Sequence, residues 1–476
     1  MLVAALSTNV PSRLVRLAVA ISLTALFSVG IAAAAADSDG RPNIVLVMAD
    51  DLGYGDLGCY HVDNPLWPDA PPPSTPTPNL DRLAGRGVRF LDYHAQPVCS
   101  PTRAALMTGR YPQRSGVDGV IYADPKQNRH HGLQPSEWTL AEALREAGYT
   151  TAAFGKWHLG YDVAFNPLEH GFDRFVGYVS GNIDYVSHLD RMGIPDWYDG
   201  RRLRPEHGYV TYLITEHAER FVREQATSDE PYFVYVAHEC PHDPIQKPGD
   251  PPTRRSGHVG NLWTPKGKER DASRRAMIAA MDEGVGRLME AIAEAGDSRP
   301  TLLLFCSDNG AVPFGDNGPW RGNKGSIFEG GQRVPLIVSR YDGTDSNARD
   351  SDAVCMTADL MPTLCDYAGA APSQADRPID GVSLRPILDD ASAVLADRTI
   401  FQQYRGAGFA RRGRLKYVID RPGRKGRSSD ALYNLTVSPD ESQPSADDAA
   451  KAELAAAYRS WAAAVAADAT PQPSHP

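Results

Sequence analysis

The chain has 476 residues, of which 42% are hydrophobic and 23% charged, as is ordinary for a globular protein. Its length is enough to bury a large core, and we expect one large domain with a smaller one. The formal net charge of −10 argues against nucleic acid as a partner, because binding to a phosphate backbone needs a basic surface. A small anionic substrate is not excluded, since a site can be locally positive within an acidic protein.

Residues 1–36 are predicted to be a signal peptide. Arg13 and Arg16 precede an apolar run from Leu17 that ends in five alanines, and the small residues before Asp37 are typical of a cleavage site. The run approaches the ~20 residues that span a bilayer, so an uncleaved anchor is the alternative. Its Ser, Thr and Ala content favours cleavage, and we expect an exported protein, periplasmic or extracellular.

The first buried strand is predicted over Asn43–Ala49, a continuous apolar run. It ends in Asp50 and Asp51, followed by a Gly-Tyr-Gly turn. Two acidic residues where a buried strand emerges are poorly explained as a solvated loop. The sheet edge at which such strands end is where α/β proteins bind ligands.

The segment Cys99-Ser-Pro-Thr-Arg103 is predicted to start a helix. Ser100 or Thr102 can cap it, Pro101 suits the first turn, and the following Ala-Ala-Leu-Met propagates it. Cys99 would then lie beside the free N–H groups and the positive end of the helix dipole, with Arg103 one turn on. Such a position stabilises an anionic nucleophile or substrate. A buried structural cysteine is the alternative for this segment taken alone.

Further strands and helices alternate along the chain. Helices are expected over 79–83, 137–147, 209–225 and 272–295, and strands over 88–93, 149–154, 232–237, 302–305 and 335–339. The alternation predicts an α/β fold with a large, mostly parallel sheet flanked by helices. From about Leu395 the pattern changes: 409–420 and 432–435 are predicted strands of a small antiparallel sheet, and Ala-rich 447–467 is predicted to be a surface helix. Cys355 and Cys365 are candidates for a disulfide, which the sequence leaves open.

Oxygen-bearing side chains follow two of these strands. Asp50 and Asp51 follow the first, and Asp308 and Asn309 follow the strand over 302–305. Four such side chains from parallel strand ends can converge on a hard cation, Ca²⁺ or alternatively Mg²⁺. Either pair alone is more typical of a simple turn.

Basic groups gather in three other segments. Lys156 and His158 lie in Gly155-Lys-Trp-His-Leu-Gly160, and two residues apart on a strand end they point to the same face. His238 and His242 follow the strand over 232–237, and either alone is more often structural than catalytic. Lys324 lies in a Gly-rich segment that also carries Glu329 and Arg333, which we expect only to brace the loop.

Together with the Cys99 segment, these segments resemble, in the same order along the chain, the signatures of the type I sulfatases of the alkaline phosphatase superfamily, over about residues 42–434. The resemblance implies that a formylglycine-generating enzyme converts Cys99 to formylglycine (3-oxoalanine), which is used as its hydrate. It implies a Ca²⁺ site made by Asp50, Asp51, Cys99, Asp308 and Asn309. The implied catalytic residues are Cys99, Arg103, Lys156, His158, His242 and Lys324. It also implies a catalytic domain over 37–394 and a C-terminal antiparallel subdomain with a tail over 395–476.

The implied reaction is hydrolysis of a sulfate monoester. One hydroxyl of the hydrate attacks sulfur, while His242 and Lys324 assist departure of the alcohol. His158 then removes the proton of the second hydroxyl, so that the aldehyde re-forms and sulfate leaves. Basic groups and the metal neutralise the charge of the ester.

The substrate is indicated by a polar and aromatic stretch that contains His188, Asp190 and Arg191. It resembles the glycan sulfatases that act on galactose or N-acetylgalactosamine sulfates, so these three residues are candidates for sugar binding, with a structural surface loop as the alternative. A phosphoester or phosphonate hydrolase of the same superfamily is the enzyme alternative, although phosphonate hydrolases usually have Asp-His where this chain has Asp308-Asn309. A sulfated-glycan-binding protein with unmodified Cys99 is the third. The sugar, the sulfate position and the oligomeric state stay open.

Overall fold

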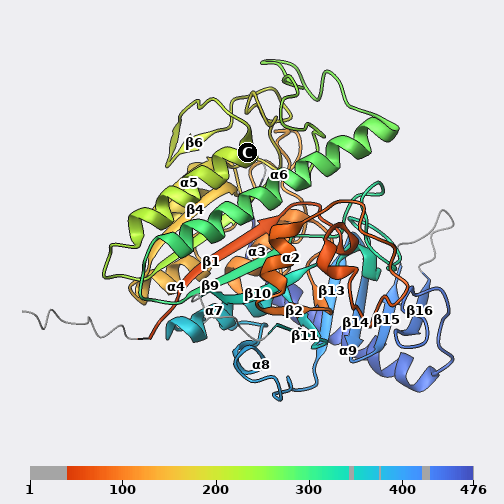
Figure 1. The fold of residues 1–476 in the computed structure, drawn as a ribbon. Coiled ribbons are helices and arrows are strands. Elements are labelled where there is room, and N and C mark those ends of the chain that lie inside the picture. The colour runs from red at the N-terminus through yellow and green to blue at the C-terminus, as the bar shows by residue number, and fades with distance from the viewer. Residues whose placement is uncertain (1–39, 342–347, 375–376, 421–428, 475–476) are drawn as a thin grey trace, which may run out of the picture. The chain divides into compact units, whose positions relative to one another are not determined.

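The protein is built on a ten-stranded sheet, seen here in a computed structural model that describes residues 40–341, 348–374, 377–420 and 429–474 (Figure 1). The predicted signal peptide lies outside the described residues. The strands follow one another in space as β11-β2-β10-β9-β1-β8-β4-β5-β6-β7. Their bounds are β1 Asn43–Ala49, β2 Val88–Phe90, β4 Thr150–Lys156, β5 Arg174–Tyr178, β6 Tyr198–Asp199, β7 Arg202–Leu203, β8 Tyr232–Ala237, β9 Thr301–Ser307, β10 Leu336–Tyr341 and β11 Arg349–Ser351.

Five neighbouring strands form the parallel centre of this sheet. β9, β1, β8, β4 and β5 run in one direction, whereas β10 runs antiparallel between β9 and β2. The mostly parallel sheet predicted from the sequence is therefore confirmed. Because parallel strands end at the same edge, the residues that follow β1, β4, β8 and β9 are brought together there.

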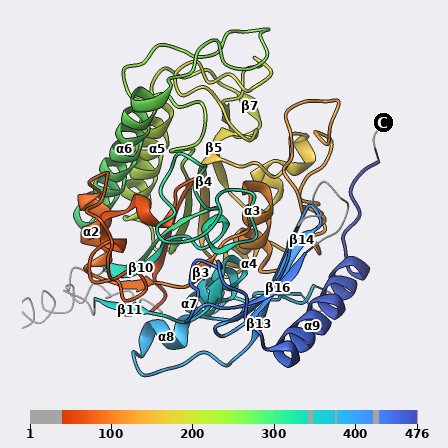
Figure 2. The ribbon, with the colours of Figure 1, turned by 90° about the vertical axis from the view of Figure 1, so that its right-hand side faces the viewer.

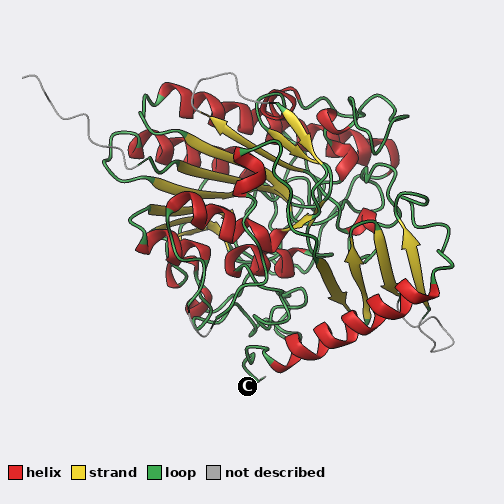
Figure 3. Ribbon diagram, turned by 90° about the horizontal axis from the view of Figure 1, so that it is seen from below, coloured by secondary structure: helices red, strands yellow, loops and turns green. Residues whose placement is uncertain are grey.

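Helices cover both faces of the sheet (Figures 1 and 3). Their bounds are α2 Pro78–Ala84, α3 Cys99–Thr108, α4 Leu140–Glu146, α5 Val210–Gln225, α6 Gly267–Glu294, α7 Leu360–Ala368 and α8 Arg385–Asp389. Alternate residues of β1 point to opposite faces: Val45 and Val47 pack in the core with α2, α5 and α6, whereas Leu46 and Met48 pack with α3, α4, α7 and α8. Within the described residues, no helix combines the length and apolar character needed to span a bilayer.

A separate four-stranded antiparallel sheet follows near the C-terminus (Figure 2). Its strands are β13 Thr399–Tyr404, β14 Ala407–Arg412, β15 Leu415–Ile419 and β16 Asp430–Asn434, and α9 Asp448–Ala467 packs across it. Trp461 of α9 stacks on Phe401 of β13 with ring centroids 5.1 Å apart. This small sheet and its Ala-rich helix agree with the sequence-based prediction.

Several boundaries differ from those expected. The strand expected over 88–93 is two strands, β2 and β3 (Tyr93–His94), and β3 pairs with β12 (Cys355–Met356) in a small sheet of its own. The strand expected over 409–420 is likewise a hairpin, because Gly413 turns the chain with a φ of 53°. All six cysteines are free thiols, so Cys355 and Cys365 do not form the disulfide considered above.

Candidate active site

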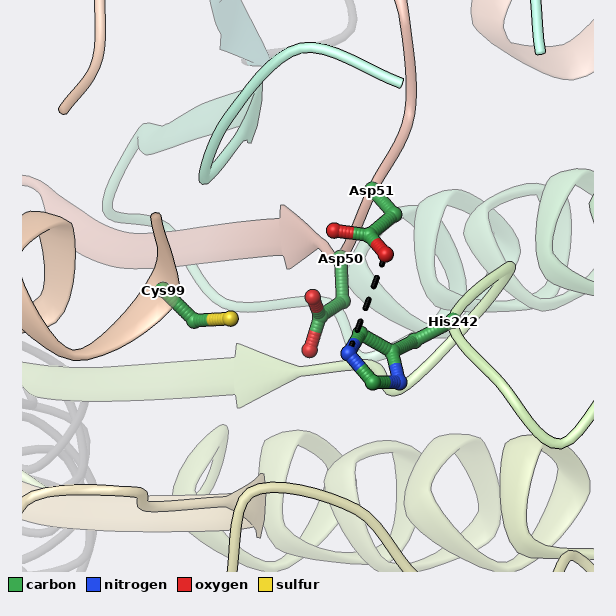
Figure 4. Close-up of side chains that lie close together, drawn as sticks. All are labelled: Asp50, Asp51, Cys99 and His242. Carbon is green, nitrogen blue, oxygen red and sulfur yellow. Dashed lines mark ion pairs between the residues drawn. The ribbon is translucent and has the colours of Figure 1, made fainter. Parts of the chain in front are cut away.

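The carboxyl edge of the parallel strands gathers four side chains that offer metal-ligand atoms. Asp50, Asp51, Cys99 and His242 each place one such atom within 4.8 Å of all the others. In Figure 4 the Cys99 sulfur points toward the Asp50 carboxylate, and His242 faces Asp51 from the opposite side. The Nε2 atom of His242 lies 3.7 Å from Asp51 Oδ2. Three segments far apart in the sequence thus meet at one point.

Asp308 and Asn309, after β9, close this group from the neighbouring strand. Asp308 Oδ1 accepts a hydrogen bond from the Asp51 amide at 3.2 Å, and Asn309 Nδ2 donates to Asp51 Oδ1 at 2.7 Å. Asp50, Asp51, Asp308 and Asn309 are all buried. Two of their oxygens, Asp50 Oδ1 and Asn309 Oδ1, are buried without a hydrogen-bond partner among the described residues. Buried polar atoms normally have partners, so these oxygens fit a cation that prefers oxygen ligands, such as Ca²⁺.

Cys99 is the first residue of α3, as the sequence predicts. The predicted caps are wrong, because the residue before the helix is Val98 and no side chain caps it. Ser100 Oγ instead accepts from the Ile121 amide at 3.2 Å, and Thr102 Oγ1 accepts from the Gln96 amide at 3.0 Å. Both hydroxyls face neighbouring backbone, which leaves the N-terminus of α3 open beside the Cys99 side chain.

Three cations are paired with the three carboxylates of the site. Lys156 contacts Asp50, Lys324 Nζ lies 2.6 Å from Asp51 Oδ1, and Arg103 Nη2 lies 3.0 Å from Asp308 Oδ2. Three carboxylates and three cations nearly cancel. A bound divalent cation would make the site positive, as binding of an anionic ester requires.

The charges around Cys99 and Asp308 shift their pKa values in opposite directions. Burial opposes ionisation of the Cys99 thiol, but Lys156 and Lys324 outweigh it and hold its pKa well below the ordinary value. Burial and the repulsion of Asp50 and Cys99 raise the pKa of Asp308 well above its usual range. The site therefore stabilises a negative charge at position 99.

Two histidines differ in protonation. Burial and Lys156 lower the pKa of His158, whose Nε2 donates to the Ile121 carbonyl at 2.9 Å and whose Nδ1 is then an available base. Burial and Lys324 would lower the pKa of His242, but Asp51 and Asp50 raise it to about 9. A neutral and a protonated histidine in one site have the properties of a base and an acid.

Two residues shortly before His242 in the sequence, His238 and Glu239, are fully buried. His238 is fully buried, neither ring nitrogen has a hydrogen-bond partner among the described residues, and burial lowers its pKa to about 4. Burial raises the pKa of Glu239 to about 8, against the opposing charges of His242 and Lys156. Sequence reasoning missed Glu239, although it lies between two histidines after a buried strand.

A cavity of about 230 Å³ opens onto the candidate active site. Cys99, His158, His242 and Lys324 line it, together with Val120, Ile121, Tyr122, Ala123, Tyr161, Gly181, Asn182 and Arg191. Arg103 is not among them: its guanidinium is buried beneath the site, where it also donates to the Lys156 carbonyl and to the Tyr235 hydroxyl. Sequence reasoning missed Tyr122 and Tyr161, which no motif marks.

The three candidates for sugar binding do not behave alike. Arg191 lines the cavity, whereas His188 and Asp190 are buried away from it. His188 Nε2 bonds to the Gly208 carbonyl at 3.0 Å, and Asp190 Oδ1 accepts from the amides of Met192 and Ile194. These two residues fold the loop, and Arg191 alone of the three faces the cavity.

A second buried group of charges, which we call the Asp92 cluster, lies outside the cavity lining. It comprises Asp92, His94, Glu329, Arg333, Arg411, Lys416 and Glu441. Asp92, His94 and Glu329 offer ligand atoms within 4.8 Å of one another. The carboxylate oxygens of this cluster are already paired with basic side chains: Arg411 lies 2.6 Å from Asp92, and Lys416 lies 2.7 Å from Glu329. Glu329 and Arg333, expected to brace the Lys324 loop, pair at 2.9 Å.

Fold and site together define an α/β protein with a candidate anion-binding centre at the carboxyl edge of its mostly parallel sheet. Residues 42–370 match the family described as Sulfatase. The chain is 35% identical over 406 residues to N-acetylgalactosamine-6-sulfatase of Rattus norvegicus, covering 81% of this chain and 72% of that protein. It is 33% identical over 383 residues to arylsulfatase A of Homo sapiens, covering 73% and 68%.

A solved structure is similar as well. Ps i-CgsB in complex with k-i-k-neocarrahexaose superposes with a TM-score of 0.74 at 26% identity, covering 88% of this chain and 92% of that one. The chain belongs to the sulfatase family, and its activity is that of a sulfuric ester hydrolase.

Proposed function

We propose that this enzyme hydrolyses sulfate monoesters of a sulfated carbohydrate through a formylglycine made from Cys99 and a bound Ca²⁺. The observation that carries the proposal is that Cys99, His158, His242 and Lys324 line one cavity, while buried Lys156 lies close enough to help hold the pKa of Cys99 low. A sulfate ester is an anion, so a nucleophile can approach it only where its charge is neutralised.

The cation would be held by the oxygens of Asp50, Asp51, Asp308 and Asn309, with residue 99 as a further ligand. Two of these oxygens lack partners, and an all-oxygen set favours Ca²⁺, with Mg²⁺ as the alternative. When bound, the ion supplies Lewis acidity that polarises oxygen and neutralises developing charge.

Converted to hydrated formylglycine, residue 99 would offer one hydroxyl as the nucleophile toward sulfur and a second whose deprotonation would release sulfate, so that no stable sulfated enzyme would remain. Lys156 and Lys324 bind sulfate oxygens, and Arg103 acts from below by fixing Asp308 and Asp50. The net reaction consumes water and releases an alcohol and sulfate.

The two histidines divide the proton transfers. His242 is held protonated by Asp51 and Asp50, so it donates a proton to the departing alcohol oxygen, with Lys324 beside it. His158 is neutral and fixed by the Ile121 carbonyl, so its Nδ1 accepts the proton of the second hydroxyl. The opposite pKa shifts match these opposite roles.

The substrate class rests on the relatives. N-acetylgalactosamine-6-sulfatase is similar to 81% of the length of this chain, and Ps i-CgsB was solved with a neocarrahexaose. Of the cavity residues, Arg191 and Asn182 are the candidates for contacts to the sugar. We propose a galactose-type or N-acetylgalactosamine-type sulfated glycan.

Maturation and location follow from the N-terminal sequence. We propose a signal peptide over 1–36, export to the periplasm or beyond, and oxidation of Cys99 by a formylglycine-generating enzyme on the way. The boundaries 37–394 for the catalytic domain and 395–476 for the C-terminal subdomain belong to the same proposal.

The test compares wild-type enzyme, co-produced with a formylglycine-generating enzyme, with Cys99→Ala. The wild-type peptide that contains residue 99 should weigh about 18 Da less than its sequence mass, because a thiol has become an aldehyde. Wild type should release sulfate from 4-nitrophenyl sulfate and Cys99→Ala should not; substantial turnover by the variant would refute the proposal. The ratio of kcat/KM for matched aryl sulfate and phosphate esters separates a sulfatase from a phosphohydrolase.

A further inference from the structure

The size of the cavity sets how much of a substrate it can hold. Its volume of about 230 Å³ is below the roughly 300–1,000 Å³ typical of pockets for larger ligands. On the proposed function, the cavity therefore takes the sulfated unit itself. Any neighbouring unit or second substituent of the glycan must lie at the rim.

Arg191 supplies a cation at this rim. Its side chain is exposed and lines the cavity. The loop that carries it is fixed from beneath by buried Arg254, which donates to Asn182 Oδ1 at 2.9 Å and to the Leu189 carbonyl at 3.0 Å. The position of Arg191 on the rim is thus set by a rigid support.

Arg405, from the small C-terminal sheet, contacts a residue that lines the cavity. It is exposed, and its Nη2 donates to the hydroxyl of Tyr122, a cavity residue, at 2.7 Å. Arg405 and Gly406 form the two-residue turn between β13 and β14, with φ of 50° and 79°. Such turns strongly favour Asn, Asp or Gly at both positions, so an arginine there is costly and suggests a function.

Neither arginine has an acidic partner in the part of the chain that the structure describes, where no carboxylate lies within the 4.0 Å ion-pair distance of Arg191 or Arg405. Arg129 differs: it lies 4.0 Å from Asp190 and over the Tyr161 ring. Two cations without a counter-charge, beside a site for an anionic substrate, are poised to bind a second anion.

We propose that Arg191 and Arg405 determine specificity by binding a second anionic group of the glycan, a sulfate or a carboxylate, outside the cavity. The C-terminal subdomain would then contribute to substrate choice through the β13–β14 turn. A substrate that carries only the scissile sulfate would leave both arginines unused. The preference should weaken with salt, because both groups are exposed.

The experiment uses the full-length enzyme, converted to the formylglycine form, and pairs of sulfated saccharides. Each pair consists of a sulfated monosaccharide and the same sugar with either a second sulfate or a linked uronic acid. The variants are Arg405→Asn, which suits the turn, and Arg191→Gln. The matched control is Arg223→Gln on α5, which removes an exposed charge paired with Glu294. The readout is the ratio of kcat/KM within a pair.

Wild type and the control should share one preference for the doubly anionic member, and each rim variant should reduce it roughly five-fold, mainly through KM. If the variants lower the kcat/KM ratio more for the pair with a second sulfate, the second anion is a sulfate; if they lower it more for the pair with a uronic acid, it is a carboxylate. If wild type hydrolyses 4-nitrophenyl sulfate but shows no such preference in any pair, or keeps it in both rim variants, the rim proposal is overturned. Failure on 4-nitrophenyl sulfate itself would instead overturn the proposed function.

Discussion

Two buried clusters of this protein use the same chemical groups in different ways. The proposed catalytic cluster, Asp50, Asp51, Cys99 and His242, and the Asp92 cluster both bring ligand-type atoms within 4.8 Å. The proposed catalytic cluster opens onto a cavity, and Asp50 Oδ1 in it and Asn309 Oδ1 beside it have no hydrogen-bond partner among the described residues. In the Asp92 cluster, arginine and lysine side chains from the loop after β9 and from the small sheet pair with the acids, and none of its members lines the cavity.

This difference indicates that the Asp92 cluster stabilises the fold, whereas the other cluster is the candidate active site. In the Asp92 cluster, Arg333 and Arg411 outweigh burial and hold the pKa of Asp92 well below its ordinary value, so the folded protein stabilises this charge. In the proposed catalytic site the two neighbouring acids differ: Lys156, His242 and Arg103 outweigh burial and lower the pKa of Asp50, whereas the pKa of Asp308 is raised, so the folded protein resists the Asp308 charge. Proximity of acidic groups alone therefore does not mark a metal site. What distinguishes the proposed site is a cavity that reaches the group, together with the Asp50 and Asn309 oxygens that have no hydrogen-bond partner among the described residues.

The largest expected effect is the loss of activity in Asp308→Asn. The substitution removes a charged oxygen of the proposed metal site, and we expect kcat/KM for 4-nitrophenyl sulfate to fall by about 10³-fold or more. Because the folded state disfavours the Asp308 charge and Arg103 keeps Asp50 as a counter-charge, the urea midpoint in calcium-free buffer should fall much less than in Asp92→Asn. A clear loss of stability in this variant would place Asp308 with the bracing acids instead.

Asp92→Asn should show the reverse pattern. It leaves Arg333 and Arg411 buried with Glu329 as their one remaining acidic partner among the described residues, and removing one partner of a buried ion pair typically costs about 3–5 kcal/mol of unfolding free energy. Measured on the folded fraction, kcat/KM should stay within a few-fold of wild type, since Asp92 does not line the cavity. The difference in urea midpoint from Asp308→Asn is the measurement. Equal stability of the two variants would break the distinction.

The sequence allowed much of the site to be predicted, because its positions follow from backbone regularity. Asp50 and Asp308 follow continuous apolar runs, and such runs predict buried parallel strands whose ends must meet. Cys99 begins the helix that Pro101 and the following Ala-Ala-Leu-Met predict, although the expected Ser and Thr caps are not used. Each of these inferences needs only local pattern and the rule that parallel strands share an edge.

Side-chain direction was harder to predict. Arg103 points beneath the carboxylates, because buried Asp308 and Asp50 attract its guanidinium more strongly than the cavity does. His188, with a φ of 55°, folds back onto the Gly208 carbonyl. Arg405 comes from a sheet more than 200 residues beyond Tyr122, and no local pattern reveals such a contact. Loop direction and long-range pairing depend on the whole fold.

His238 extends the comparison to pH. His94 in the Asp92 cluster has an acid 2.8 Å away, whereas His238 has no such partner among the described residues and its pKa is lowered by burial alone to about 4. The unfolded chain takes up a proton below about 6.5, and the folded protein cannot do so until about 4. The unfolding free energy should therefore fall as pH falls through this window, by at most about 3 kcal/mol from this residue.

His238→Phe removes this titration and keeps the site apolar, so its urea midpoint should depend less on pH between 6.5 and 4 than that of wild type. His94→Phe is a poor substitute, because it also removes a hydrogen bond to Asp92. An unchanged pH slope in His238→Phe would mean that other groups carry the acid sensitivity.

Calcium should raise the unfolding free energy by binding beside Asp50 and Asp308 and not at the Asp92 cluster. This is the smallest of the four effects predicted here. At 100 times its dissociation constant, a ligand that binds only the folded state adds about 2.7 kcal/mol to the unfolding free energy. We expect such a calcium-dependent rise in the urea midpoint of wild type and of Asp92→Asn, whose catalytic oxygens are intact. Asp308→Asn should lose most of it, and titration calorimetry should show the same order of affinities. A rise lost in Asp92→Asn but kept in Asp308→Asn would reverse the assignment, because the ion would then bind where arginines and a lysine already neutralise the acids.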